Sequence, residues 1–330
     1  MIISSHSGTK AILEKYDLRS RKSLGQNFLI DQHVLGKIIR AADIGPEDIV
    51  LEIGAGIGGL TQILAEYASK VIAVEIDKYL VAALKDIFLN YQNVQIVHGD
   101  ILKLDLSKFD DFKDVEFVDF KDIEAIAEDI RVKNNDAGNA EDTRVENNDV
   151  GNAENAESTK NVKIVANLPY YVTTPIIMHL LENYRFKSIT VMVQEEVAER
   201  MVSGPDNKKS YGALSLAVEY HARASITAYV PPNSFIPRPK VGSAVVHMDI
   251  LQKPPVDADK PALFANIKSG FGKRRKTLVN CLHSSEIYNF TKEELGDILK
   301  SCGLSESVRA EELTLDDWSK LTFRLNSGGL

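Results

Sequence analysis

Short apolar runs alternate with stretches of helical periodicity in the first part of the chain. Ile49–Ile53, Val71–Glu75 and Val94–Val97 each have the length of a buried strand. Between and before them, residues 33–45 and 60–65 place apolar side chains at helical spacing. Strands that alternate with helices are typical of a parallel sheet covered by helices. The pattern therefore predicts an α/β fold.

The rest of the chain divides into a continuation of the strand-and-helix pattern and a helical part. Lys253-Pro254-Pro255 marks a boundary, and from Lys260 onward the pattern is helical. We therefore expect a catalytic domain of residues 1–252, whose residues 1–20 form a polar arm, and a helical domain of residues 253–330. The remaining expected elements are strands at 162–166, 189–193, 225–230 and 244–250, and helices at 175–181 and 195–201.

A glycine loop, Gly54–Gly59, joins the first strand to a helix. Glycines let the backbone approach a ligand closely, and a helix N-terminus favours electron-rich groups. The loop also satisfies G-x-G-x-x-G, so a nicotinamide enzyme is a fair competitor. Glu52 precedes the loop, where an acid would repel a pyrophosphate but suit the cationic methionine end of S-adenosylmethionine.

Two more acids follow the next strands. Glu75 stands 21 positions after Gly54 and is placed to hold ribose hydroxyls. Asp100 follows the third strand and can take the cofactor's adenine amino group, although a strand-end acid can equally be a helix cap. With Glu52 and Gly56, their order on successive strands favours S-adenosylmethionine.

The tetrapeptide Asn167-Leu168-Pro169-Tyr170 follows a buried strand. The Asn167 side-chain oxygen accepts one hydrogen bond, and the Leu168 carbonyl can accept another because Pro169 cannot continue the sheet. Tyr170 offers a ring face for stacking. The predicted ligand is the amino group of an adenine extruded from its stack. The alternative is an ordinary strand-to-helix turn with a buried tyrosine.

Charge is unevenly distributed along the 330 residues, whose net charge is −8. Residues 107–160 hold 16 acids and 7 bases, and the rest of the chain carries +1. This segment contains a 13-residue repeat, in which residues 131–141 recur as 144–154, and cannot bury enough surface to fold alone. We expect either a functionally neutral repeat expansion or an acidic flap that competes with RNA for the bases clustered within residues 10–22 and 268–276.

Composition also excludes several classes. No 18-residue apolar run is present, and the first residues lack the apolar region of a signal peptide. Cys281 and Cys302 make neither a metal site nor a disulfide framework, so we expect reduced thiols and no metal. The expectation is a cytoplasmic monomer without a membrane partner.

Five motifs in order resemble the ribosomal RNA adenine dimethyltransferase family of the KsgA type. They are Lys22–Leu29, Val50–Glu75, Asn167–Pro175, Phe235–Ser243 with the pattern F-x-P-x-P-x-V-x-S, and Phe271–Leu282 with an R-R-K-T-L core. The resemblance implies a Rossmann-like class I methyltransferase sheet with a small C-terminal helical domain that faces RNA. It also implies transfer of two methyl groups from S-adenosylmethionine to N6 of each of two adjacent adenosines near the 3′ end of small-subunit (16S) rRNA.

The resemblance also assigns residues. Phe235 would close over the target adenine, which Asn167, Leu168 and Tyr170 would hold. Cofactor contacts would come from Asn27, Leu29, Gly54, Glu75, Asp100 and Asn167, beside Gly56 of the loop. RNA contacts would come from Lys22, Arg238, Lys273, Arg274, Arg275 and Lys276. The family connects the positions of Asp100 and Asn167 by a much shorter segment, so the acidic repeat is a departure.

Other functions stay open at this point. The large-subunit rRNA methyltransferases of macrolide resistance typically have Ile where this chain has Leu168. A non-catalytic ribosome-assembly factor would not need intact Glu75, Asp100 and Asn167. A DNA adenine methyltransferase is disfavoured because a C-terminal helical domain suits structured RNA. A dehydrogenase is disfavoured because no His or Lys stands out as an acid for hydride transfer.

Overall fold

The computed structural model describes residues 1–18, 21, 24–106, 159, 161–273, 275–285 and 287–328. The chain forms two compact units, one of Met1–Val191 with Asn233–Pro239 and one of Met192–Pro232 with Lys240–Leu330. Contacts thus group residues 192–232 and 240–252 with the C-terminal helices. The division into functional domains at 252/253 stays a prediction. Among the described residues, no helix has the length and apolar character needed to span a membrane.

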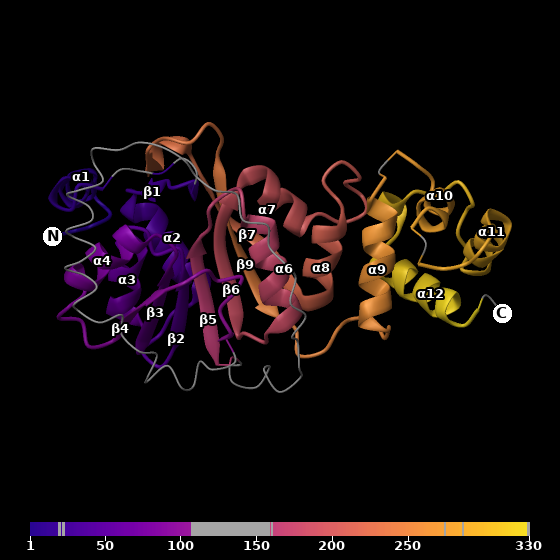
Figure 1. The fold of residues 1–330 in the computed structure, drawn as a ribbon, viewed down its shortest axis with the longest axis horizontal. Helices are drawn as coiled ribbons and strands as arrows, with labels where there is room; N and C mark the ends of the chain where they lie inside the picture. The colour runs from indigo at the N-terminus through magenta and orange to yellow at the C-terminus, as the bar shows by residue number, and fades with distance from the viewer. Residues whose placement is uncertain are drawn as a thin grey trace. The chain divides into compact units, whose positions relative to one another are not determined.

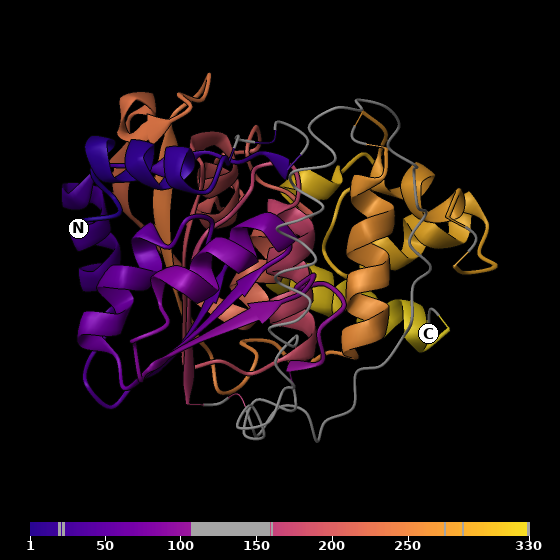
Figure 2. The same cartoon turned by 60° about the vertical axis from the view of Figure 1, so that its left-hand side comes forward.

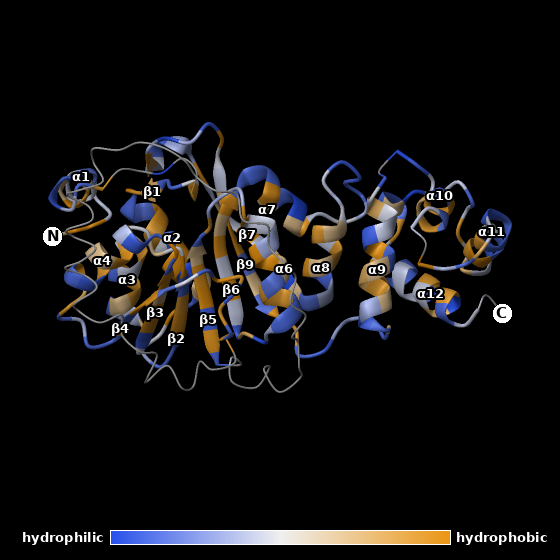
Figure 3. Ribbon diagram, viewed as in Figure 1, coloured by the Kyte–Doolittle hydropathy of each residue, from blue (hydrophilic) through white to orange (hydrophobic). Residues whose placement is uncertain are grey.

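A sheet with the strand order β4-β3-β2-β5-β6 organises the first unit. Strands β2, β3, β4 and β5 are parallel, which confirms the predicted sheet. Most of their residues are buried, and the strands are coloured largely as hydrophobic in Figure 3. The strands are β2 (Ile49–Ile53), β3 (Lys70–Glu75), β4 (Val94–His98), β5 (Val162–Asn167) and β6 (Ser188–Gln194), the last running on into the second unit.

Helices pack against these strands, α3 on β3 and α4 on β3 and β4, while α2 contacts α3 and β5 (Figure 1). Asp43 adopts a left-handed φ of 47° and ends α2 three residues before the predicted end. Because β2 pairs in parallel with both β3 and β5, the carboxyl ends of these three strands are neighbours. The helices are α2 (Gln32–Ala42), α3 (Gly59–Tyr67), α4 (Lys78–Ile87) and α6 (Thr173–Asn183).

The N-terminal segment differs from the predicted polar arm. It forms the helix α1 (His6–Lys15), which lies at the indigo end of the chain in Figure 2. The helix begins after Ser5, whose side chain accepts a hydrogen bond from the Gly8 N–H. Ile3 and Ile12 are buried in one cluster with Ala55 and Ile57 of the glycine loop. The prediction was wrong because these scattered isoleucines find their partners far along the chain, where no local pattern shows them.

Two short strands join distant segments of the first unit. β1 (Phe28–Leu29) and β8 (Phe235–Ile236) are antiparallel, with Leu29 opposite Phe235. A 3-10 turn, η4 (Pro232–Ser234), precedes β8. Asp31 caps α2 and also accepts a hydrogen bond from the Ser234 hydroxyl at 2.9 Å. The motif that contains Phe235 is therefore held against the motif that contains Asn27.

The second unit combines an antiparallel strand pair with helices. In β7 (Ala222–Val230) and β9 (Ser243–Ile250), the register shifts between Ile226 and Ala228. Trp318 is fully buried in its core, and Figures 1 and 2 show the C-terminal helices gathered together. The helices are α7 (Glu195–Val202), α8 (Ala213–His221), α9 (Lys260–Phe271), α10 (Leu278–His283), α11 (Lys292–Ser301), η5 (Ala310–Glu312) and α12 (Leu315–Asn326).

The basic residues Lys273, Arg275 and Lys276 lie in a turn, which corrects the expectation of helix from Lys260 onward. Helix α9 ends at Phe271, and Thr277 is the N-cap of α10. Phe271 packs beside Trp318 with ring centroids 6.2 Å apart, and Leu278 is buried. Both apolar residues that flank the turn therefore pack in the same core.

A buried ion pair joins the amino ends of β2 and β5. Lys163 Nζ lies 2.8 Å from Asp48 Oδ2, and the two side chains are 6% and 11% exposed. Lys187, which is 56% exposed, reaches the other Asp48 oxygen at 3.1 Å. Burial by itself would raise the pKa of Asp48, but hydrogen bonds from Lys163 and the Gly45 N–H lower it below its ordinary value.

We predict that Lys163→Met lowers the free energy of unfolding by about 3 kcal/mol, because a buried carboxylate loses its buried partner. The control Lys187→Met removes an exposed partner of the same carboxylate and should cost less than about 1 kcal/mol. Urea denaturation at pH 7 measures both. Equal losses in the two variants would contradict the assignment of Lys163 as the dominant partner.

Candidate functional site

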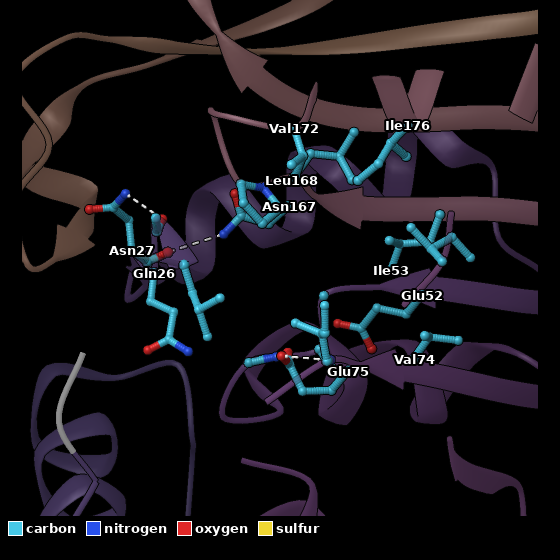
Figure 4. Close-up of a pocket in the computed structure, with 18 of the residues that line it drawn as sticks. Gln26, Asn27, Glu52, Ile53, Val74, Glu75, Asn167, Leu168, Val172 and Ile176 are labelled. Atoms are coloured by element: carbon cyan, nitrogen blue, oxygen red, sulfur yellow. Dashed lines mark hydrogen bonds between the residues drawn. The ribbon is translucent and has the colours of Figure 1, made fainter. Parts of the chain in front are cut away.

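A cavity of about 340 Å³ lies at the carboxyl ends of β2, β3 and β5 in the first unit (Figure 4). This volume is within the range of small-molecule sites. Its walls come from residues 24–29, from the glycine loop, and from the segments that follow β3, β4 and β5. All the predicted cofactor residues line it, namely Asn27, Leu29, Gly54, Gly56, Glu75, Asp100 and Asn167.

The glycine loop adopts a backbone that side chains would strain. Gly54 and Gly56 have φ values of 75° and 62°, in the left-handed region. A Cβ on Gly56 would lie 3.4 Å from the Phe28 ring, and one on Gly54 would lie 3.8 Å from the Asn167 carbonyl. The loop therefore needs glycine for its turn and brings bare backbone to the cavity.

Glu75 is anchored at the end of β3 by three backbone donors. Its Oε2 accepts from the Gly56 N–H at 2.8 Å, and its Oε1 accepts from the N–H groups of Ile76 and Asp77 at 3.0 Å. Burial raises the pKa of this carboxyl, and these hydrogen bonds act in the opposite direction. The carboxyl is thus held in one orientation, with acceptor capacity left for a ligand.

Glu52 differs from what the sequence led us to expect. It lines the cavity but is 1% exposed, and its Oε2 lies 2.6 Å from the Thr61 hydroxyl. Burial raises the pKa of Glu52 to about 8, so the carboxyl is mostly neutral at pH 7. We expected the negative charge of Glu52 to repel a pyrophosphate and to attract a cationic ligand. Burial reduces that charge, so both effects are weaker than predicted.

Asp100 both lines the cavity and acts as a cap, the two roles that the sequence left open. It lines the cavity, and its Oδ1 also accepts a hydrogen bond from the Leu102 N–H at 3.1 Å, as a capping acid does. Within the described chain, no further hydrogen bond of this carboxyl is found. The cap orients the side chain and leaves the second oxygen for a ligand.

Asn167 and Asn27 are joined across the cavity wall. Asn167 Nδ2 donates to the Asn27 carbonyl at 3.2 Å, and Asn27 Nδ2 donates to the Gly25 carbonyl at 3.0 Å (Figure 4). Because the nitrogen of Asn167 is engaged, its Oδ1 is left as the acceptor. The N-terminal wall thus determines which way the Asn167 amide faces.

The other predicted catalytic residues divide into two groups. Leu168 and Tyr170 line the cavity beside Asn167, and Leu168 is 1% exposed. Phe235 is 3% exposed, is absent from the cavity lining, and faces Leu29 across the β1–β8 pair. Its role above the adenine stays a prediction that requires the ring to become accessible.

The predicted RNA contacts are dispersed. Arg238 is exposed in the first unit, and Lys273, Arg275 and Lys276 are exposed in the second. Lys22 and Arg274, like the acidic segment 107–158 and Lys160, lie outside the described residues. The sequence also missed Gln26 and Tyr171, which line the cavity. The second aromatic in N-L-P-Y-Y was an available signal for Tyr171.

The residues present fit S-adenosylmethionine. Bare glycine backbone lines a cavity of nucleoside size, and two separately anchored acids, Glu75 and Asp100, supply acceptors for hydroxyl and amino groups. Asn167 adds an amide oxygen at the end of β5. This fold and this site define a class I S-adenosylmethionine-dependent methyltransferase.

Comparison with known proteins specifies the family. A family model described as ribosomal RNA adenine dimethylase matches residues 17–326. The ribosomal RNA small subunit methyltransferase A of Alkaliphilus metalliredigens (strain QYMF) is 43% identical over 322 residues, which cover 97% of this chain and 96% of that protein. The chain belongs to the ribosomal RNA adenine dimethylase family, and the nicotinamide alternative is therefore excluded.

Solved structures agree with this assignment. A dimethyladenosine transferase from Plasmodium falciparum is 25% identical, with a TM-score of 0.64 over 92% of this chain and 98% of that chain. The 23S rRNA methyltransferase ErmE, at 20% identity, has a TM-score of 0.57 over 91% of this chain and 100% of its own. The predicted class I methyltransferase fold is thus confirmed, and the likeness to ErmE shows that the fold alone does not decide the substrate.

We predict a pH-dependent difference in stability between the wild-type protein and the variant Glu52→Gln. The free energy of unfolding of wild type minus that of the variant should fall by about 3 kcal/mol between pH 5.5 and pH 8. The folded Glu52 has its pKa at about 8, against an ordinary 4.5. Between these values the native state keeps a proton that the unfolded chain has lost, so unfolding becomes easier as pH rises. Urea denaturation at both pH values measures the difference.

Glu66→Gln is the matched control, because Glu66 is an exposed carboxylate on α3. A difference between wild type and Glu52→Gln that does not change with pH would show that Glu52 titrates normally. An equal change with pH for Glu66→Gln would show that the effect is not specific to Glu52.

Proposed function

We propose that this chain transfers two methyl groups to N6 of each of two adjacent adenosines near the 3′ end of small-subunit rRNA, and so contributes to small-subunit biogenesis. The observation that carries the proposal is the orientation of Asn167, whose nitrogen is held by the Asn27 carbonyl so that Oδ1 is left to accept from an amino group. The full-length similarity to a small subunit methyltransferase A supports the choice of rRNA. Action as a cytoplasmic monomer stays a prediction from the sequence.

A second acceptor lies next to Asn167. Within the described chain, no hydrogen bond reaches the Leu168 carbonyl, while the following carbonyl, that of Pro169, accepts from the Thr173 hydroxyl at 3.0 Å. The Asn167 oxygen and the Leu168 carbonyl can therefore take the two hydrogens of one amino group. Tyr170, beside them in the cavity, offers a face for the base.

These acceptors address the weak point of the reaction. The amino nitrogen of adenine is a poor nucleophile because its lone pair is delocalised into the ring. Two acceptors favour a pyramidal nitrogen whose lone pair is available. S-adenosylmethionine, when bound, supplies an electrophilic methyl group on a sulfonium. The chain contributes orientation and electrostatic complementarity, and we assign no general base because the amine proton is acidic once the nitrogen carries positive charge.

We predict that Asn167→Ala lowers the rate of dimethyladenosine formation by about 100-fold or more, because the nitrogen loses an oriented acceptor. The matched control is Asn183→Ala, a partly buried asparagine whose amide bonds the His179 carbonyl on α6. The assay supplies labelled S-adenosylmethionine to undermethylated small subunits, large subunits and duplex DNA in parallel, and product nucleosides are identified by mass.

The three substrates separate the competing functions. Dimethyladenosine in small-subunit RNA alone is the expected result. Label in large-subunit RNA would move the chain to the macrolide-resistance type, and label in DNA would overturn the choice of RNA. Bound cofactor without label in any substrate would favour a non-catalytic assembly role.

We further propose that the exposed bases of the turn between α9 and α10 contact RNA phosphates. Replacing Lys273, Arg275 and Lys276 together by alanine should weaken binding to small-subunit rRNA and lower the slope of log K against log salt by about 2 to 3. The control is Lys320→Ala, an exposed lysine of the same unit that pairs with Asp316 at 2.6 Å. Filter binding from 50 to 200 mM salt measures the slope, and an unchanged slope would remove this turn from the interface.

A further inference from the structure

Tyr171 combines cavity lining with high exposure. It follows directly on the motif Asn167–Tyr170 and lines the cavity, yet 55% of its surface is accessible. Leu168, in the same segment, is 1% exposed. An aromatic ring buries a large apolar area when a ligand covers it. The rim of the cavity therefore carries a ring whose surface is available to a bound molecule.

The ring is positioned by the opposite wall of the cavity. A Cβ on Gly25 would lie 3.2 Å from Tyr171 Cδ1 and 3.7 Å from the Cβ of Pro169. Gly25 also has a φ of 59°, which few other residues adopt without strain. The ring thus packs against the segment of residues 24–29 and joins that wall to the segment after β5.

Tyr171 shares the cavity with the two acids Glu75 and Asp100. Burial of the hydroxyl, and after it the negative charges of Asp100 and Glu75, raise the pKa of Tyr171. The hydroxyl therefore stays protonated at neutral pH and is a hydrogen-bond donor. Tyr171 thus packs against Gly25 and lines the same cavity as Glu75 and Asp100, the two carboxyls that are anchored to receive the adenosyl part of the cofactor.

We propose that Tyr171 is a further cofactor-binding residue, whose ring forms the solvent side of the pocket and covers the bound nucleoside thioether. The inference rests on the proposed function only in taking S-adenosylmethionine as the occupant of this pocket. Because the cofactor must be exchanged before each methyl transfer, the ring also influences the release of S-adenosylhomocysteine. Stacking of a nucleotide that flanks the target adenosine is the alternative, and it predicts a different result below.

The test is calorimetric titration of the full chain with S-adenosylhomocysteine in the absence of RNA. Tyr171→Ala should raise Kd about tenfold or more, as loss of an aromatic platform does for bases. Tyr171→Phe keeps the ring and should raise Kd only a few fold. Tyr67→Ala is the matched control, because Tyr67 is 50% exposed in the same unit and does not line the cavity.

A second variant tests the ring through its neighbour. Gly25→Ala should also raise Kd, since the added Cβ displaces the ring. In the double variant with Tyr171→Ala the two effects should be less than additive, because both act on one contact. Thermal unfolding of each variant verifies that the fold is kept.

The outcomes distinguish this inference from the proposed function. Failure of the wild-type chain to bind S-adenosylhomocysteine would overturn both. Normal binding by wild type and by Tyr171→Ala would overturn the inference alone. If that variant instead raises only the KM for undermethylated small subunits, the ring is an RNA contact and the cofactor role is wrong.

Discussion

The register of three parallel strands is the constraint on which the site depends. Ile53 of β2 is opposite Val74 of β3 on one side and Ala166 of β5 on the other. The next residues, Gly54, Glu75 and Asn167, therefore reach the same edge of the sheet together. A one-residue change of register would turn the acid or the amide to the other face. Apolar burial of the strands thus determines where the polar groups meet.

A second support comes from the start of the chain. Ile3 and Ile12 pack behind the glycine loop, and Asn27 accepts the hydrogen bond that orients Asn167. Arg21 lies over the Tyr79 ring, 4.5 Å from its centroid, close to the end of β3 that carries Glu75. The cavity is therefore closed by segments that are distant in sequence, and its geometry requires the folded N-terminus.

Stability and chemistry occupy opposite ends of the same sheet. At the amino ends of β2 and β5, the pair Lys163–Asp48 compensates two buried charges directly. At the carboxyl ends, no cation among the described residues pairs with the buried Glu52, and burial raises its pKa to about 8, while Glu75 accepts hydrogen bonds from backbone N–H groups. The carboxyl oxygens of Glu75 therefore keep lone pairs that can accept hydrogen bonds from a ligand.

The local sequence pattern determined much of this protein, including the strands, the glycine loop, and the placement of Glu75, Asp100 and Asn167 at the strand ends that line the cavity. Apolar periodicity records which face of an element is buried, and strand ends in a parallel sheet meet at one edge. Only the tertiary structure decided that residues 6–15 form a packed helix, that Lys273, Arg275 and Lys276 lie in a turn, and that Phe235 is covered. It also decided that burial raises the pKa of Glu52 and that Tyr171 lines the cavity. Each of these depends on a partner or on a degree of burial that arises far along the chain, and no local pattern of residues records such contacts.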